Sequence, residues 1–234
     1  MVTSRGFRLS ETTSGLSEQS DSVAIPKPLL RGRLHQVALL LAIPAGVRLV
    51  LIARSGSVRA AMLVYALSLV GLYGTSAAYH RLNLSPRASR ILRSFDHSMI
   101  FVLIAGTYTA FAVLVLPGLW QLFILLVMWT GALAGITLKL INVDRFSLAG
   151  GTLYITLGWI GIAALPPMVS NAEILPLALT LAGGLMYTFG TLVLLRRRPD
   201  PNPRVFGYHE IWHAVVIAAS ACHYVAITLL VPTF

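Results

Sequence analysis

The sequence predicts an all-α fold: an integral membrane bundle of seven transmembrane helices, with the N-terminus in the cytoplasm and the C-terminus outside. Of the 234 residues, 56% are hydrophobic and only 11% are charged, whereas an average soluble domain has about 25% charged residues. A soluble protein of this size has too little interior to bury so much apolar surface. The apolar residues also form seven long runs, and most basic residues lie between them on one side. Soluble enzyme folds are therefore excluded.

A polar tail precedes the first apolar run. Residues 1–33 are rich in Ser, Thr and Glu and contain no apolar stretch of the kind that a secretory signal needs. We expect a mostly disordered tail that ends in the basic residues Lys27, Arg31 and Arg33. The predicted organisation is this tail, 1–33, followed by a transmembrane domain, 34–234.

Seven apolar runs have the length that a bilayer requires. A helix needs about 20 residues to cross the hydrocarbon core, and it satisfies its own backbone hydrogen bonds in lipid. Pro117-Gly118 and Pro166-Pro167 interrupt the pattern where turns are expected, and the spacing of Gly131 and Gly135 favours a close helix contact. The runs are 35–53, 60–79, 97–116, 119–138, 148–166, 174–195 and 211–231.

The basic residues predict the topology. Loops rich in Lys and Arg remain in the cytoplasm, and an odd number of spans then places the C-terminus outside. The net charge of +10 comes from these short clusters, so we expect no nucleic-acid partner and a surface that contacts membrane lipids. The other side carries only Arg54 and Arg59, with Arg48 nearby. Outside the tail, the cytoplasmic set is Arg81, Arg87, Arg90, Arg93, Lys139, Arg145, Arg196, Arg197, Arg198 and Arg204.

Ionisable residues near the membrane spans mark a candidate site, because such groups are costly to place in lipid. His80 ends the second run, Asp96 precedes the third, and His209 and His213 lie at the start of the seventh. The alternating helix directions place all of them at the cytoplasmic depth. His209 and His213 are four residues apart and share a helix face. Two such imidazoles can bind one zinc ion, and His80 is the natural third ligand. The alternative is interfacial histidines hydrogen-bonded near the headgroups.

Two further residues are candidates for catalysis beside this metal. Asp96 is placed to hold or deprotonate a zinc-bound water, although it could also cap the third helix. Ser76 precedes His80 by four residues and shares its helix face. Its hydroxyl could bond at the metal cavity or back to its own helix.

Two other polar residues receive structural interpretations. His209-Glu210-Ile211-Trp212-His213 matches the H-E-x-x-H pattern of zinc proteases, in which the Glu is a general base. No acidic residue follows Glu210 to supply a further ligand, so we favour a solvated first-turn residue stabilised by the helix dipole. His223 lies ten residues beyond His213, about 15 Å deeper. We expect it to be buried and satisfied by a neighbouring helix, or else to line an internal cavity.

Three blocks of sequence resemble the hemolysin III family of bacterial membrane proteins, part of a superfamily with progestin and adipoQ receptors and alkaline ceramidases. The resemblance extends from about residue 30 to the end, and it departs from the family at Ala110, where many members have Pro. The blocks are Ser76-Ala-Ala-Tyr-His80, Phe95-Asp96-His97-Ser-Met-Ile100 with Ile104-Ala-Gly-Thr-Tyr-Thr109, and Gly207-Tyr-His209-Glu-Ile-Trp-His213 with His223-Tyr224.

The resemblance implies a location in the bacterial plasma membrane and seven helices around a cavity that opens to the cytoplasm or the bilayer. It also implies zinc on His80, His209 and His213, with Asp96 bonded to the zinc water and Ser76 nearby. The leading hypothesis is a zinc-dependent, ceramidase-like hydrolase of membrane lipid amides or esters. The alternatives are a non-catalytic receptor-like or membrane-homeostasis protein with structural zinc, and a pore-forming hemolysin. Helices rich in Leu and Ala, without a charged stripe, disfavour the pore.

Overall fold

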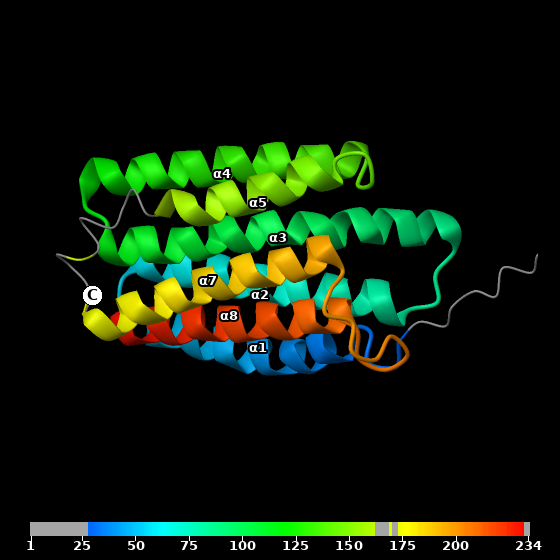
Figure 1. Ribbon diagram of the computed structural model, residues 1–234. Helices are drawn as coiled ribbons and strands as arrows, with labels where there is room; N and C mark the ends of the chain where they lie inside the picture. Colours follow the sequence, from blue (N-terminus) through cyan, green and yellow to red (C-terminus); the bar gives the residue numbers. More distant parts are fainter. Residues whose placement is uncertain (1–27, 162–168, 170–172, 232–234) are drawn as a thin grey trace, which may run out of the picture.

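The computed structural model describes residues 28–161, 169 and 173–231, and seven α-helices account for most of these residues. Their axes lie side by side and roughly parallel to one another (Figure 1). This arrangement confirms the predicted all-α bundle. Six are long and apolar enough to cross a membrane, and α5 is shorter over its described residues. The helices are α1 (Arg33–Ile52), α2 (Gly56–Arg81), α3 (Pro86–Val115), α4 (Gly118–Ile141), α5 (Ser147–Ile160), α7 (Ile174–Arg196) and α8 (Tyr208–Leu230).

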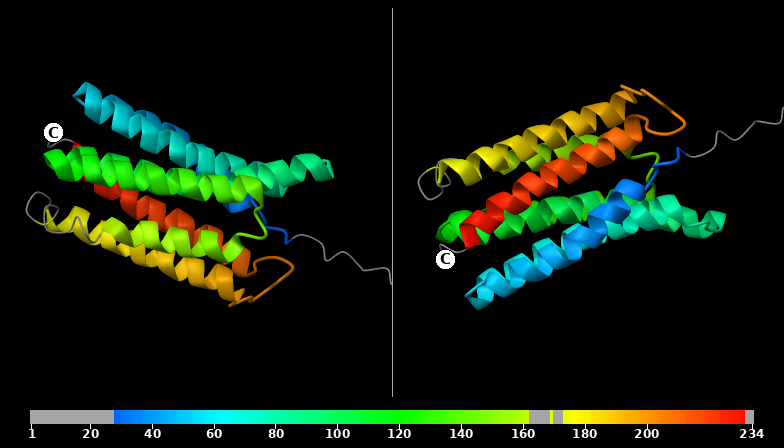
Figure 2. Two further views of the ribbon diagram at one scale, coloured as in Figure 1. Left: turned by 90° about the horizontal axis from the view of Figure 1, so that it is seen from above. Right: turned by 90° about the horizontal axis from the view of Figure 1, so that it is seen from below.

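The helices are arranged in chain order around the bundle. Each contacts the next, and α8 returns to contact α1 (Figure 2). Helix α3 also contacts α5 and α8. In the 18-residue apolar stretch of α3, 61% of the residues are buried inside the protein, compared with 22% in the corresponding stretch of α7. Helix α3 is therefore the central element, and its side chains face the interior from several sides.

Helix α3 begins well before the apolar run that predicted it. The Ser85 hydroxyl accepts a hydrogen bond from the Ala88 amide at 3.3 Å, and Pro86 occupies the first turn. Both are normal helix-start features. Asp96 consequently lies inside the helix, so its interpretation as the N-terminal cap is wrong. Hydropathy marks only the part of a helix at lipid depth, and α3 continues past it.

The turn between α3 and α4 lies where Pro117-Gly118 predicts it. Helix α3 ends at Val115, and Gly118 has a φ of +47° at the start of α4. Glycine adopts this left-handed backbone region without the steric cost that a side chain adds. The other predicted turn, Pro166-Pro167, lies outside the described residues.

The two spaced glycines of α4 have the packing role expected of them. A Cβ atom added at Gly131 would lie 2.5 Å from the Leu157 side chain of α5. One added at Gly135 would lie 2.3 Å from the Phe101 ring of α3. Helix α4 thus approaches both neighbours closely at its small residues.

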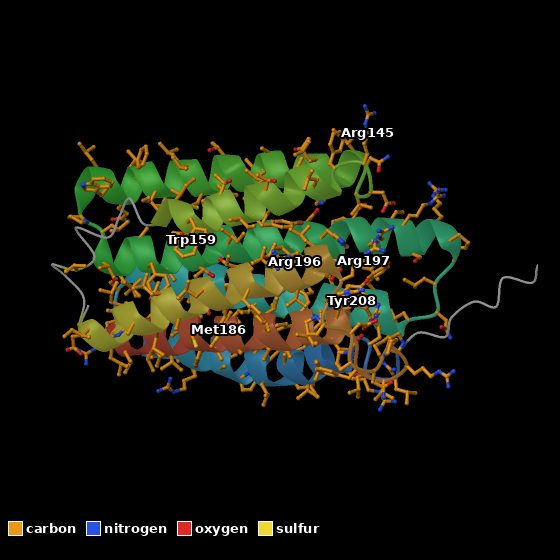
Figure 3. The ribbon with its side chains drawn as sticks, viewed as in Figure 1. Arg145, Trp159, Met186, Arg196, Arg197 and Tyr208 are labelled. Atoms are coloured by element: carbon orange, nitrogen blue, oxygen red, sulfur yellow. The ribbon has the colours of Figure 1, made fainter. Side chains whose placement is uncertain are left out.

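One end of the bundle, here called the basic end, carries the Arg-rich helix ends and loops. It comprises the starts of α1, α3, α5 and α8 and the ends of α2, α4 and α7; Figure 3 shows Arg145, Arg197 and Tyr208 there. The segment before α1 belongs to it, because the amides of Leu29 and Leu30 donate to the carbonyls of Arg204 and Val205 at 3.0 and 3.3 Å. The rest of the expected tail, residues 1–27, lies outside the described residues.

Candidate metal centre

Three histidines from α2 and α8 meet at the basic end. His80 lies in the last turn of α2, and His209 and His213 lie one turn apart at the start of α8. The ring centroids of His209 and His213 are 4.6 Å apart, and the His80 centroid lies 5.0 and 5.1 Å from them. One nitrogen of each ring lies within 4.8 Å of the other two, close enough to hold a metal ion. The structure thus brings together the three histidines that the sequence singled out.

The geometry of this cluster fits zinc. The Nε2 atoms of His80 and His209 are 3.2 Å apart. Two nitrogens bound to zinc at about 2.0–2.1 Å with a tetrahedral angle stand roughly 3.3 Å from each other. The His213 Nδ1 atom is buried without a hydrogen-bond partner among the described residues. Three imidazole ligands leave the fourth position of a zinc tetrahedron open, which is the pattern of catalytic sites.

Asp96 and Ser76 line the same cavity as His209 and His213. Ser76 is 2% exposed, and its hydroxyl interacts with the Asp96 carboxylate. Helix α3 therefore contributes an acidic group to the cavity that two histidines of the cluster also line. Asp96 also lies 3.6 Å from His97 Nδ1, whose principal contact is the Arg93 carbonyl at 3.0 Å. His97 remains outside the three-histidine cluster.

Glu210 differs from its prediction. It is fully buried rather than solvated. One carboxylate oxygen forms an ion pair with Arg31, and the other accepts a hydrogen bond from the Gly207 amide at 2.9 Å. Glu210 is absent from the described residues that line the cavity. Its role is to cap α8 and to join it to the segment before α1, and it does not face the cavity as a general base would.

Comparison with known proteins assigns the family. A sequence model described as Haemolysin-III related matches residues 23–224. The chain belongs to the haemolysin-III-related family. It is 35% identical to Hemolysin-3 of Bacillus cereus over 190 residues, which cover 80% of this chain and 84% of that protein. It is 33% identical to a Hemolysin-3 homolog of Bacillus subtilis over 190 residues, which cover 80% and 86%. The resemblance read from the three sequence blocks is therefore confirmed, and the chain is a multi-pass membrane protein.

A fourth histidine of this haemolysin-III-related protein was missed from the sequence. The His35 ring from α1 stacks on the His213 ring, with centroids 3.9 Å apart and an interplanar angle of 20°. His35 is 3% exposed, so its ring is enclosed beside the cluster. The rule that selected the other histidines applies here too, since His35 begins an apolar run on the same side of the membrane.

The cavity beside the cluster has a volume of about 210 Å³ and lies between α3, α5, α7 and α8. His35, Ser76 and Asp96 make one end polar, and most of the remaining wall is apolar. Two of its lining residues, Gly158 of α5 and Leu181 of α7, are exposed. Helices α5 and α7 thus supply the exposed part of the cavity wall.

His223 lies at the far end of the same cavity. Its Nε2 atom is 3.1 Å from the Thr180 carbonyl of α7, and the residue lines the cavity wall. Both interpretations offered by the sequence hold, because the neighbouring helix satisfies one nitrogen while the ring faces the cavity.

Proposed function

We propose that this haemolysin-III-related protein is a zinc-dependent hydrolase of membrane lipid amides or esters. The observation that carries the proposal is one juxtaposition. Two histidines of a three-histidine cluster with metal-binding spacing, His209 and His213, line one largely apolar cavity together with a carboxylate and a buried hydroxyl. A structural metal site needs neither the acidic group nor the cavity.

The proposed ligands are His80, His209 and His213. A zinc ion held there supplies a Lewis acid for the scissile carbonyl and an activated water. Asp96 is the proposed general base, because its carboxylate faces the cavity beside the histidines and can accept a proton there. Ser76 orients that carboxylate through its hydroxyl and is placed to stabilise negative charge that develops on the substrate oxygen.

The cavity supports a lipid substrate over a water-soluble one. Its wall beyond the polar end is formed by apolar side chains such as Ile104, Phe111 and Leu177. An acyl chain that entered between α5 and α7 would bury apolar surface there while its carbonyl reached the polar end. With the basic end in the cytoplasm, as the positive-inside rule proposes, the substrate would come from the inner leaflet.

The test is hydrolysis by purified, zinc-loaded protein of a panel of ceramides and acyl esters, followed by lipid mass spectrometry. Asp96→Asn should retain zinc and lose turnover, because the amide keeps the shape of the carboxylate but does not accept the proton. Asp144→Asn is the matched control: Asp144 lies at the same end, is exposed and pairs with Arg93. It should retain both zinc and turnover. Intact lipids with zinc-loaded wild type would overturn the proposal.

A non-catalytic zinc clamp is the second candidate, and one observation favours it. The His80–His209 contact joins α2 to α8, which are not neighbours in the ring of helices. A clamp predicts that zinc removal lowers the unfolding temperature while no lipid is consumed. The pore-forming alternative predicts dye release from liposomes that persists after zinc removal.

A further inference from the structure

The chain segment that precedes α1 lies against the three-histidine cluster at the basic end. This segment, residues 28–32, is here called the strap. Two of its amides, those of Leu29 and Leu30, donate to carbonyls of residues 204–205, in the loop between α7 and α8, at 3.0 and 3.3 Å. The strap therefore connects the start of α1 to the loop that leads into α8.

The rest of the strap contacts both helices that carry the candidate ligands. Gly32 is buried and has a φ of +77°, and a Cβ atom added to it would lie 2.7 Å from Cβ of His80. The strap backbone thus packs directly on the candidate ligand of α2. Arg31 forms its ion pair with Glu210, which separates the two candidate ligands of α8 in the chain.

The position of the strap matters for the path of a metal ion. A hydrated cation is costly to move through apolar surroundings, so an ion must reach the cluster from water. The cavity that His209 and His213 line has a largely apolar wall. The basic end, with its Arg-rich loops, is the nearest surface that borders water. The strap belongs to that end and contacts the cluster there.

Few contacts hold the outer part of the strap. Leu29 is 63% exposed, so its side chain adds little burial to the two backbone hydrogen bonds. Segments that are held by few contacts open locally while the rest of the fold stays intact. The strap can therefore detach from residues 204–205 without unfolding of α1, α2 or α8.

Because the proposed function requires a resident zinc ion, this inference rests on it. We propose that the strap is the gate of the metal centre: zinc enters and leaves while residues 28–32 are detached from residues 204–205 and from His80. A gate that closes over the site with and without metal alike slows both directions by the same factor. That factor cancels in the dissociation constant, so the gate controls how fast zinc exchanges and leaves its affinity unchanged.

The test is the kinetics of zinc exchange in purified full-length protein. Release is measured by competition with a chelator, and uptake by mixing metal-free protein with zinc. Leu29→Pro removes the amide hydrogen that residue 204 accepts and leaves the Arg31–Glu210 ion pair in place. Release and uptake should both become roughly two- to tenfold faster, the effect of one net hydrogen bond, with an unchanged dissociation constant. Leu29→Ala is the matched control, because it keeps the amide hydrogen, and it should retain both wild-type rates.

Faster release with unchanged uptake in Leu29→Pro would overturn the gate, because it indicates a weakened site and not an easier passage. Unchanged rates in that variant would overturn it as well. A second measurement needs no substitution: hydrogen exchange of the Leu29 and Leu30 amides gives the rate at which the strap opens. Zinc release from the wild type that is faster than this opening would refute the gate.

The gate and the proposed function fail in different ways. Zinc-loaded protein that hydrolyses lipids, but exchanges zinc at the same rate in Leu29→Pro and Leu29→Ala, would refute the gate alone. Gated zinc exchange in a protein that leaves every lipid intact would refute the hydrolase alone.

Discussion

The Arg31–Glu210 ion pair should hold the metal-binding end of α8 in place. Glu210 is fully buried, and the Arg31 side chain is 21% exposed. Replacing Arg31 with Met keeps an apolar stem of similar length, but of the two described partners it leaves the buried carboxylate only the Gly207 amide. Glu210 lies between His209 and His213 in the chain, so a displaced α8 start also moves two candidate ligands.

The expected size of this effect follows from the burial. Removing one partner of a buried ion pair destabilises a protein by about 3–5 kcal/mol. Partial exposure of Arg31 lets water reach the pair, so we expect a loss of about 2–3 kcal/mol in the free energy of unfolding. Glu210→Gln alone should cost less, because its side-chain carbonyl oxygen can still accept from Gly207. Adding Glu210→Gln to Arg31→Met should recover part of the loss, since no unpaired charge remains buried.

Unfolding of the four proteins in mixed micelles, analysed as a double-mutant cycle, measures the coupling between the two residues. Zinc affinity of each variant is measured in parallel and should fall with Arg31→Met more than with the double variant. Strictly additive losses of stability would refute the reasoning. A stable Arg31→Met protein with normal zinc affinity would refute it as well.

Two further pairs of substitutions test the packing around the cavity. Gly183→Ala should lower stability and displace His223, because the new Cβ would lie 2.5 Å from that ring. Gly184→Ala should be neutral, because its new Cβ would have no neighbour from outside its own helix backbone within 4 Å among the described residues. Equal unfolding temperatures for the two variants would contradict this reasoning. His35→Phe should retain zinc affinity, because it preserves the ring stacked on His213, and His35→Ala should weaken it by up to about tenfold, the value of an aromatic contact. Equal weakening by both variants would show that the His35 nitrogens, and not its ring, matter.

The architecture could be predicted from the sequence because lipid imposes a simple rule on it. A helix that crosses a bilayer must be apolar over about 20 residues, and the apolar runs mark those residues directly. The ends of the helices could not be predicted from the apolar runs in the same way. Helix α3 starts at Pro86, where a capping Ser and a Pro rather than apolarity set the boundary.

The candidate site was predictable to the extent that it depends on depth in the membrane. Depth follows from helix direction, so His80 and His209 could be placed at one level from the sequence. Contacts across the bundle depend on rotation of each helix, which apolar runs do not specify. The stacking of His35 on His213 and the burial of Glu210 against Arg31 are contacts of this kind. The contact between the Tyr187 and His223 rings is another contact of this kind.

The zinc content of the purified protein tests the central claim, that three histidines from two helices hold one metal ion. Elemental analysis of the wild type should give about one zinc per chain, the stoichiometry of a three-histidine site. His80→Ala should lose the metal as completely as the His209→Ala/His213→Ala double variant, although the substitutions lie on different helices. His97→Ala, at the same end but outside the cluster, should retain it. Zinc that persists in His80→Ala, or a wild type that binds none, would contradict the account.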